Sequence, residues 1–425
     1  MARGGKYFVT RNDSCIAAFV VEVPCFVSGR QFGKDSTGGF CVTATHTDSP
    51  CLRLRPRAFA EKEGYHMGSV ECYGGGLWHT WFDRGLGIAG KVALRIGTKV
   101  EERLMRISKP LFYLPNLAIH LKTVEEIGAF KINKVMRAHD TIRFPRNHRS
   151  KTRSLVQEQH LQPILCSAIA EQLSQSSEGE KRESKDKDED QRLPPALERL
   201  VTQTIGLPGA KLLDWDFCLM DSTPSRLSGI HSEFIESPRL DNLASTFAAF
   251  EALVEASRCQ SEGAQGCGET DILVAVAFDH EEVGSESLSG ANSNILEGVV
   301  IKENANQSYA SNACSMSFVR VIAEEADIPL QDFVVRNDSR CGGTVGAMLS
   351  ARLGVRTVDI GIPQWAMHSC REICGVTDLM YLQKLLECFK TGMTLAGIVG
   401  PGAGDDGNTL IHRGLSMLRC ISCAA

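Results

Sequence analysis

Short apolar runs and turn residues fill the first quarter of the chain, a pattern typical of β-strands. Runs bounded by Gly, Asn and Asp predict strands at 6–12 (KYFVTRN), 15–23 (CIAAFVVEV) and 38–45 (GGFCVTAT). A second strand-rich stretch extends from about Leu52 to Gly97, and three consecutive glycines at 74–76 predict a bulge or a close backbone approach within it.

After Phe217 the pattern changes to strands that alternate with helices. Four apolar side chains recur at helical spacing after Asp241: Phe247, Phe250, Leu253 and Val254. The continuous apolar run 272–278 predicts a buried strand. Further helices are predicted at 311–326, 347–354 and 379–389, and further strands at 333–338 and 356–363. This alternation predicts an α/β fold, in which helices wrap a mostly parallel sheet.

One stretch has the composition of a solvated loop. Of the fifteen residues from Glu178 to Arg192, twelve carry a charge and none is aromatic or aliphatic. Such a segment cannot bury enough apolar surface to offset its ordering entropy. We therefore expect a disordered surface loop at about 173–195.

The overall composition restricts the class of protein. The 425 residues, 43% hydrophobic and 23% charged, suffice for one large or two medium domains with a buried core. A net charge of −5 gives no reason to expect nucleic acid or an anionic membrane as a partner. No apolar run approaches the ~20 residues that span a bilayer, and we recognise no signal peptide.

The 16 cysteines are scattered and lie mostly in apolar segments, for example Cys41, Cys218 and Cys388. This distribution predicts reduced thiols in a cytoplasmic protein rather than a disulfide framework. The single CxxC motif, Cys420 to Cys423, has no second pair, so neither a zinc site nor redox chemistry is favoured there.

Histidines and acidic residues follow three predicted strands and begin one predicted helix. In chain order they are His46 and Asp48 after strand 38–45, Asp241 at a helix start, Glu281 and Glu282 after strand 272–278, and His368 beyond strand 356–363. Ligands of open α/β sheets collect at the carboxyl ends of strands, so we expect these side chains to converge. Mixed nitrogen and oxygen donors suit zinc, manganese or cobalt better than calcium.

The adjacent Glu281 and Glu282 predict a division of labour in such a site. One carboxylate can bind a metal ion while its neighbour, pointing elsewhere, takes a proton from metal-bound water. Asp48 can lie beside the His46 imidazole and select its tautomer. Each feature alone has an ordinary explanation, such as a solvated Glu-Glu pair, a surface histidine or Asp241 as a helix N-cap. Their joint occurrence at successive strand exits favours the metal site.

Nine segments carry a resemblance to a known family. In chain order they are GGKYFVTRN, THTDSPCLRLRP, GGGLWHTWFDRGLGIAGKV, LPNLAIHL, ESPRLDNLAS, FDHEEVGSES, VVIKENANQSYASNA, VRNDSRCGGTVG and AMHSCREICG. With these motifs the chain resembles the M18 metallopeptidases, the aspartyl aminopeptidases, over nearly its whole length. The resemblance implies a metal-dependent aminopeptidase that removes N-terminal Asp or Glu from peptides.

The same resemblance implies a domain plan and an assembly. It implies a metallopeptidase catalytic domain formed by 1–56 and 219–425, an inserted strand-rich dimerisation domain at 57–218, and a homo-dodecamer built from dimers. It also implies two divalent metal ions. Zinc is the expected metal, with Mn²⁺ or Co²⁺ as alternatives.

Residue by residue, the motifs imply roles for the polar residues at the strand ends. His46 corresponds to a terminal ligand of one metal ion, and Asp241 to the carboxylate that bridges both ions. Glu282 and His368 correspond to ligands of the second ion. Glu281 corresponds to the general base that deprotonates a metal-bridged water.

Four further residues take roles around this centre by the same resemblance. Asp48 corresponds to the carboxylate that supports the histidine ligand. His120 of LAIHL corresponds to a histidine that reaches a neighbouring subunit's site. Lys302 of VVIK and Asp338 of RNDS correspond to residues of the substrate pocket, where a buried cation would pair with an acidic substrate side chain.

One departure from the family pattern bears on activity. After EEVGSES the family continues to a D-x-A-H-A-x-H-P-N motif, whose Asp is the last ligand on the His46 side. This sequence contains no such motif, and a segment is absent between about Ala291 and Gly298. One metal ion would then keep only His46 and the bridging carboxylate, with Asp338 as a conceivable substitute ligand. A missing strand would also leave a gap in the sheet or expose an edge.

Two hypotheses therefore stand beside each other. The chain is an active metalloaminopeptidase, or it is a catalytically impaired homologue: an assembly subunit, a splice form or the product of an incomplete gene model. A serine hydrolase is not supported, because neither GSES nor HTDS matches the G-x-S-x-G nucleophile elbow.

Overall fold

The structure is a computed structural model, and its chain folds into two compact units. It describes residues 5–11, 14–21, 40–55, 59–122, 161–170, 193–208, 210–261, 272–284, 296–304, 306, 308–334, 342–391 and 418–423. One unit comprises 1–50 and 225–425, and the other comprises 51–224. Most of the predicted charged loop, 173–195, lies outside the described residues.

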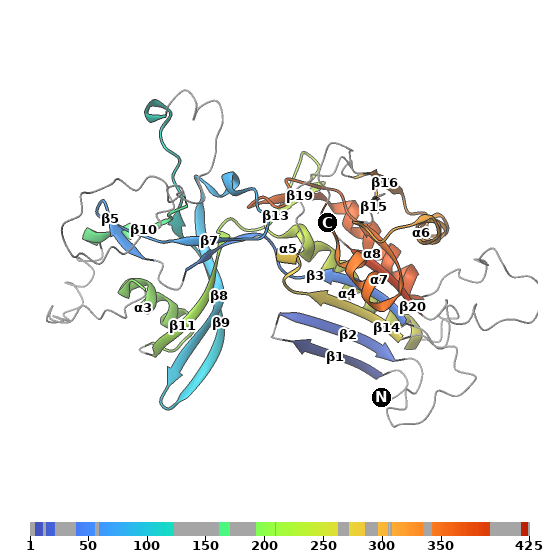
Figure 1. The fold of residues 1–425 in the computed structure, drawn as a ribbon, viewed down its shortest axis with the longest axis horizontal. Helices are drawn as coiled ribbons and strands as arrows, with labels where there is room; N and C mark the ends of the chain where they lie inside the picture. Colours follow the sequence, from blue (N-terminus) through green and yellow to red (C-terminus); the bar gives the residue numbers. More distant parts are fainter. Residues whose placement is uncertain are drawn as a thin grey trace, which may run out of the picture. The chain divides into compact units, whose positions relative to one another are not determined.

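An eight-stranded sheet forms the centre of the first unit (Figure 1). From edge to edge its strands are β1 (Gly5–Arg11), β2 (Cys15–Val21), β14 (Ile272–Phe278), β3 (Phe40–His46), β20 (Leu418–Cys423), β17 (Arg356–Gly361), β15 (Val299–Glu303) and β16 (Leu330–Val334). Of the seven neighbouring pairs, four are parallel: β14–β3, β3–β20, β20–β17 and β15–β16. The predicted α/β class is confirmed, with a sheet that mixes parallel and antiparallel pairs.

The pairing of β3 with β14 decides where the polar residues emerge. Figure 1 shows these strands side by side, although they come from distant parts of the sequence. They run parallel in register, with Phe278 opposite His46. The residues that follow both strands therefore lie at the same edge of the sheet, as the sequence predicts.

Strand β20 links the two halves of this sheet. It runs parallel to β3 on one side and to β17 on the other, so that Ile421 is opposite both Thr43 and Val358. Within the described residues, β3 and β17 connect only through β20. The gap expected from the absent segment is therefore not seen, because the eight strands pair without interruption. The CxxC cysteines, Cys420 and Cys423, lie in this strand.

Helices cover both faces of the sheet. Helices α4 (Leu240–Ser261), α6 (Ala313–Glu325) and α8 (Val376–Thr391) share one apolar core with the sheet, whereas α7 (Val345–Leu353) packs on the other face.

Helix α4 is present as predicted, but alanines form most of its buried face. Ala248, Ala249, Ala252 and Ala256 are fully buried, whereas Phe247 is 52% exposed and Val254 is 41% exposed. Small side chains allow the helix to approach the sheet and α8 closely. The spacing of large apolar residues therefore identified the helix but not the face that packs.

A small antiparallel sheet in the same unit frames the loop that carries His368. Its strands are, in order, β12 (Arg226–Ser228), β13 (Phe234–Ser237), β19 (Glu372–Gly375) and β18 (Gln364–Trp365). Because β18 and β19 form a hairpin around residues 366–371, the position of His368 is set by strand pairing on both sides.

The second unit is built on an antiparallel sheet of eight strands. Their order is β5 (Ala60–Lys62), β6 (Tyr65–Met67), β10 (Ile164–Ser167), β9 (Lys99–Tyr113), β8 (Gly85–Ile96), β11 (Lys211–Asp221), β4 (Cys51–Leu54) and β7 (Val70–Tyr73). Helix α3 (Pro195–Thr204) contacts β9, and the 3-10 helices η1 (Trp78–Trp81) and η2 (Ile119–Leu121) also belong to this unit.

The insertion expected at 57–218 falls six residues inside each bound of this unit, 51 to 57 and 218 to 224. Its role in dimerisation stays a prediction. Among the helices of the described residues, none is both long enough and apolar enough to cross a bilayer.

We predict that Ile421→Pro will loosen the sheet around the metal-ligand strand. Proline removes the backbone N–H and fits poorly in a central strand, so we expect the free energy of unfolding to fall by at least the ~1 kcal/mol of one lost ladder hydrogen bond. Hydrogen exchange should accelerate in β3 and β17, while Ile421→Val, which keeps the N–H, serves as the control. Unchanged exchange in both strands would show that β20 does not pair there.

Candidate metal centre

His46 ends strand β3 and is held at four points. Its backbone N–H donates to Asn242 Oδ1 (3.3 Å), and its carbonyl accepts from Thr246 Oγ1 (2.9 Å). Its ring Nδ1 lies 3.0 Å from the Asp48 carbonyl and 3.5 Å from Asp48 Oδ1. These contacts direct the other ring nitrogen, Nε2, to Asp241, whose Oδ1 is 3.3 Å away.

Asp48 also holds the turn that carries the two glutamates. Its Oδ1 accepts from the backbone N–H of Glu281 (3.1 Å), and its Oδ2 accepts from that of Glu282 (3.0 Å). These donors begin the short helix α5 (Glu281–Gly284), where N–H groups have no partner within the helix. One carboxylate therefore orients both the histidine and the glutamate pair.

Asp241 lies between the two histidines. Its Oδ2 is 3.1 Å from His368 Nε2, and its Oδ1 is 3.3 Å from His46 Nε2. Its backbone is non-helical, and both of its carboxylate oxygens face imidazole nitrogens. Its carbonyl accepts a hydrogen bond from Ser49 Oγ (2.6 Å), and the residue is only 4% exposed.

His368 and Glu282 complete a second group of donors. His368 Nε2 is 3.4 Å from Glu282 Oε1. The backbone of His368 is left-handed, with φ of 65°, and its N–H donates to Glu372 Oε1 (2.8 Å). The loop thus keeps His368 in a sparsely populated backbone conformation, at the position from which its imidazole faces Asp241 and Glu282.

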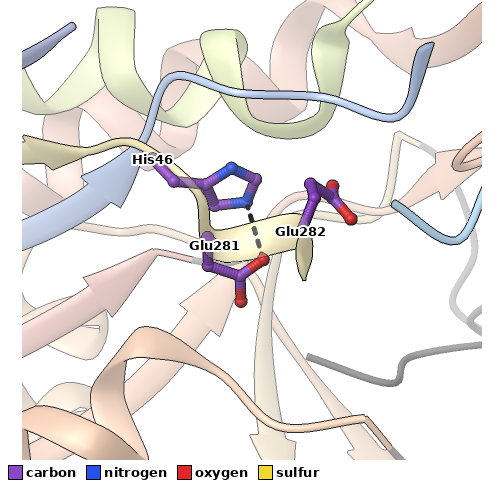
Figure 2. Close-up of side chains that lie close together, drawn as sticks. All are labelled: His46, Glu281 and Glu282. Atoms are coloured by element: carbon purple, nitrogen blue, oxygen red, sulfur yellow. Dashed lines mark ion pairs between the residues drawn. The ribbon is translucent and has the colours of Figure 1, made fainter. Parts of the chain in front are cut away.

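The candidate ligands form two overlapping groups. His46, Glu281 and Glu282 offer donor atoms within 4.8 Å of one another, and so do Asp241, Glu282 and His368. Figure 2 shows the Glu281 carboxylate beneath the His46 ring, with Glu281 Oε2 3.8 Å from Nε2, and the Glu282 carboxylate turned to a different side. The two neighbouring glutamates therefore occupy separate positions.

Strong electrostatic coupling holds these groups together. Burial by itself would raise the pKa of Asp241, but the imidazoles of His368 and His46 beside its oxygens hold that pKa well below its usual range. Burial would lower the pKa of His368, yet the hydrogen bond to Asp241 and the charge of Glu282 raise it to about 9. Burial raises the pKa of Glu282 to about 8. The centre thus favours extra positive charge, here as imidazole protons.

A divalent cation fits this donor set. The buried oxygen Asp241 Oδ1 makes no hydrogen bond of good geometry, although it faces an imidazole nitrogen. The centre offers two imidazoles and three carboxylates as donors, and such mixed N/O sets bind zinc. A cation would take the place of the imidazole protons and satisfy the uncompensated carboxylate charge.

These two groups do not include the other three residues singled out by sequence. Lys302 lies in β15, is 8% exposed, and its Nζ is 5.6 Å from the centre of the Tyr309 ring. Its charge acts on Glu281, whose pKa burial nevertheless raises. His120 is exposed on η2 in the second unit. Asp338 lies outside the described residues.

Glu372 is the residue that sequence reasoning missed. It is 2% exposed, and its Oε2 accepts from the Asp241 N–H (2.9 Å) while its Oε1 accepts from the His368 N–H. One carboxylate thus holds the backbone of two candidate ligands. The signal that could have found it was a charged residue at the start of the otherwise apolar segment EICG.

Comparison with known proteins gives the family of the chain. Residues 1–300 and 297–390 match the family described as "Aminopeptidase I zinc metalloprotease (M18)". The chain belongs to the M18 aminopeptidase family. The chain is thus a metalloaminopeptidase of this family, as the motifs implied, and the zinc chemistry of the family agrees with the donor set.

Individual relatives agree with this assignment. The chain is 34% identical to "Aspartyl aminopeptidase 1" of Schizosaccharomyces pombe, over 91% of this chain and 84% of that protein. It is 32% identical to "Probable aspartyl aminopeptidase" of Ricinus communis, over 91% and 86%. Among solved structures, the "Cryo-EM structure of the Ape4 and Nbr1 complex" matches with a TM-score of 0.74 and 32% identity, over 92% of this chain and 77% of that one.

A more distant structure, the M18 aminopeptidase from Thermotoga maritima, shares the fold, with a TM-score of 0.61 at 17% identity over 92% and 86% of the two chains. The match to the M18 family consists of two segments, which overlap at residues 297–300. This overlap lies close to the departure from the family pattern noted in the sequence. The match ends at residue 390, so strand β20 lies beyond the matched residues.

We predict that Glu372→Ala will weaken metal binding although Glu372 is not a candidate ligand. Loss of a carboxylate behind the ligands typically lowers metal affinity about 10- to 100-fold. Zinc affinity can be measured by competition with a chromogenic chelator. Glu372→Gln, which keeps one acceptor oxygen, should lose less, and Glu324→Ala on the exposed side of α6 should lose nothing. An unchanged affinity in Glu372→Ala would contradict the positioning role.

Proposed function

We propose that the chain is a two-zinc aminopeptidase that removes N-terminal Asp or Glu from peptides. The relatives from S. pombe and R. communis, both named as aspartyl aminopeptidases, support this substrate class. The observation that carries the proposal is the position of Asp241 between His46 and His368, at 3.3 and 3.1 Å. A carboxylate so placed can contribute one oxygen to each of two ions.

The protein side chains have distinct parts in this proposal. His46 and Asp241 would hold one ion, and Asp241, Glu282 and His368 the other, with Mn²⁺ or Co²⁺ as alternatives to zinc. Bound ions supply positive charge that polarises the scissile carbonyl and acidifies the attacking water. Beside His46 and the shared Asp241, the described residues on the first side offer only the two glutamates, to which the proposal gives other tasks, and this leaves the impaired homologue as the competing hypothesis.

Glu281 is the general base of this proposal. Its carboxylate lies beside the His46 ring, with Oε2 3.8 Å from Nε2, and the Glu282 carboxylate takes a separate position (Figure 2). It takes a proton from the attacking water and returns it to the leaving amine. Its neighbour Glu282, 3.4 Å from His368 Nε2, keeps the ligand position, so the two tasks do not compete.

Lys302 gives a physical reason for a preference for acidic residues. Its ammonium group is buried, and its charge acts on Glu281. An acidic substrate side chain that loses its water needs a paired positive charge. Asp338 keeps its proposed place in the same pocket.

Assembly is the second part of the proposal. We propose a homo-oligomer built from dimers, with the strand-rich unit as the dimerisation domain and His120 reaching a neighbouring subunit's centre. A related yeast structure, "Structure of S. cerevesiae mApe1 dodecamer", supports the dodecamer, although at 20% identity that likeness establishes only the fold. The cytoplasm is the proposed compartment.

We predict that Glu281→Gln will lower turnover of an Asp-linked chromogenic amide by about 10²- to 10⁴-fold, the usual contribution of a general base. Zinc content by native mass spectrometry should stay at two ions per chain, because Glu281 is not a ligand. Glu303→Gln, at an exposed position, is the control. A native protein with fewer than two ions and no turnover would instead favour the impaired homologue.

We predict that Lys302→Met will selectively impair acidic substrates. Loss of one partner of a buried charge pair costs about 2 kcal/mol or more, so kcat/KM for Asp- and Glu-amides should fall roughly 30-fold or more. A Leu-amide should be cleaved no more slowly than by the native protein. Lys99→Met, at an exposed position in the other unit, should change neither rate. A uniform loss on all three amides would remove Lys302 from the specificity pocket.

A further inference from the structure

Two cysteines far from each other in sequence meet in the strand-rich unit. Strand β4 pairs antiparallel with β11, with Arg53 opposite Cys218. Residues two positions apart on a strand face the same side of a sheet, so Cys51, Arg53 and Cys218 share one face. All three side chains are half-buried. The face is therefore accessible to a small solute.

The two sulfur atoms are in direct contact with each other and with a cation. The Cys51 thiol donates a hydrogen bond to the Cys218 sulfur, which also accepts one from Arg53. Arg53 is held in place, since its Nη2 lies 3.5 Å from Asp216 Oδ2 and its Cζ lies 4.6 Å from the centre of the Tyr73 ring. The guanidinium is thus fixed beside the acceptor sulfur.

This environment makes the two thiols unequal. The hydrogen bond from Cys51, together with the charge of Arg53, lowers the pKa of Cys218 to about 7. The same hydrogen bond and burial raise the pKa of Cys51 well above its ordinary value. At neutral pH, Cys218 is therefore the nucleophilic thiolate, and Cys51 remains a thiol in contact with it.

We propose that Cys51 and Cys218 are a redox pair, which a peroxide oxidises to a disulfide. The Cys218 thiolate attacks one peroxide oxygen and breaks the O–O bond, which leaves a sulfenic acid and a hydroxide that becomes water on protonation. Cys51 sulfur then attacks the sulfenic sulfur, and its proton leaves with the hydroxyl group as a second water. In sum, two thiols and hydrogen peroxide give one disulfide and two waters.

The position of the pair gives the disulfide its consequence. Cys51 is the first residue of the unit 51–224, and Cys218 lies near its last. The bond would close a loop that contains nearly the whole unit, and long loops gain most from closure. None of the candidate metal ligands belongs to this unit, and this inference does not rest on the proposed function.

The strand geometry also favours easy reversal. Diagonal neighbours on paired strands have Cα atoms roughly 7–8 Å apart, somewhat farther than the usual span of a disulfide. The strands must move together slightly to form the bond. A bond under such strain is readily reduced by a dithiol.

The test uses the full-length native protein. Reduced protein is treated with hydrogen peroxide, remaining thiols are alkylated, and a digest without reductant is analysed by mass spectrometry. We expect a linked peptide pair that contains Cys51 and Cys218, is two hydrogens lighter than its parts, and disappears with dithiothreitol. The main disulfide at any other position would overturn the proposal.

Variants separate the roles of the three residues. Cys51→Ser should stop at a sulfenic acid on Cys218 that dimedone traps, whereas Cys218→Ser should form neither product. Arg53→Met should slow the reaction about tenfold at pH 7, because the pKa of Cys218 moves back toward its ordinary 9.0. Arg55→Met, whose arginine pairs with Glu71, should react at the native rate. A Cys218→Ser variant that still consumes peroxide at the native rate, or an Arg53→Met variant with no change, would also contradict the pair.

Discussion

The metal centre depends on one buried carboxylate that two imidazoles compensate. Asp241 is 4% exposed, and its oxygens lie within 3.3 Å of His46 Nε2 and His368 Nε2. An unpaired charge at this depth would be costly, so the fold must bring positive charge to both oxygens. Imidazole protons and divalent cations meet the same need.

The sheet supplies the two sides of this arrangement. Strands β3 and β14 run in parallel register, which places His46 beside the residues after Phe278. His368 comes from the other half of the sheet, beyond β17, in the hairpin of β18 and β19. Strand β20 joins the halves, and it comes from a part of the chain that the M18 family does not match. The separation of the ligands thus depends in part on a strand that lies beyond the residues matched to the family.

The two units place polar groups under different constraints. In the first unit, Glu372 accepts hydrogen bonds from the backbone of two candidate ligands. A carboxylate that is not itself a candidate ligand therefore helps to position the ligands. In the second unit, Cys51 and Arg53, two positions apart on strand β4, both act on the sulfur of Cys218. In the second case the influence of the side chains comes from strand register rather than from sequence proximity.

By itself, the sequence determined the element types and the candidate ligands. The apolar run 272–278 coincides with β14, and His46, Asp241, Glu282 and His368 stand where strand exits and a helix start predict them. Local periodicity and strand-end chemistry are properties of short segments, so they can be seen in the sequence. Tertiary structure alone decided the alanine face of α4, the insertion of β20 between β3 and β17, the role of Glu372 and the contact of Cys51 with Cys218. Each of these depends on which distant segments lie against each other, and no local pattern records that pairing.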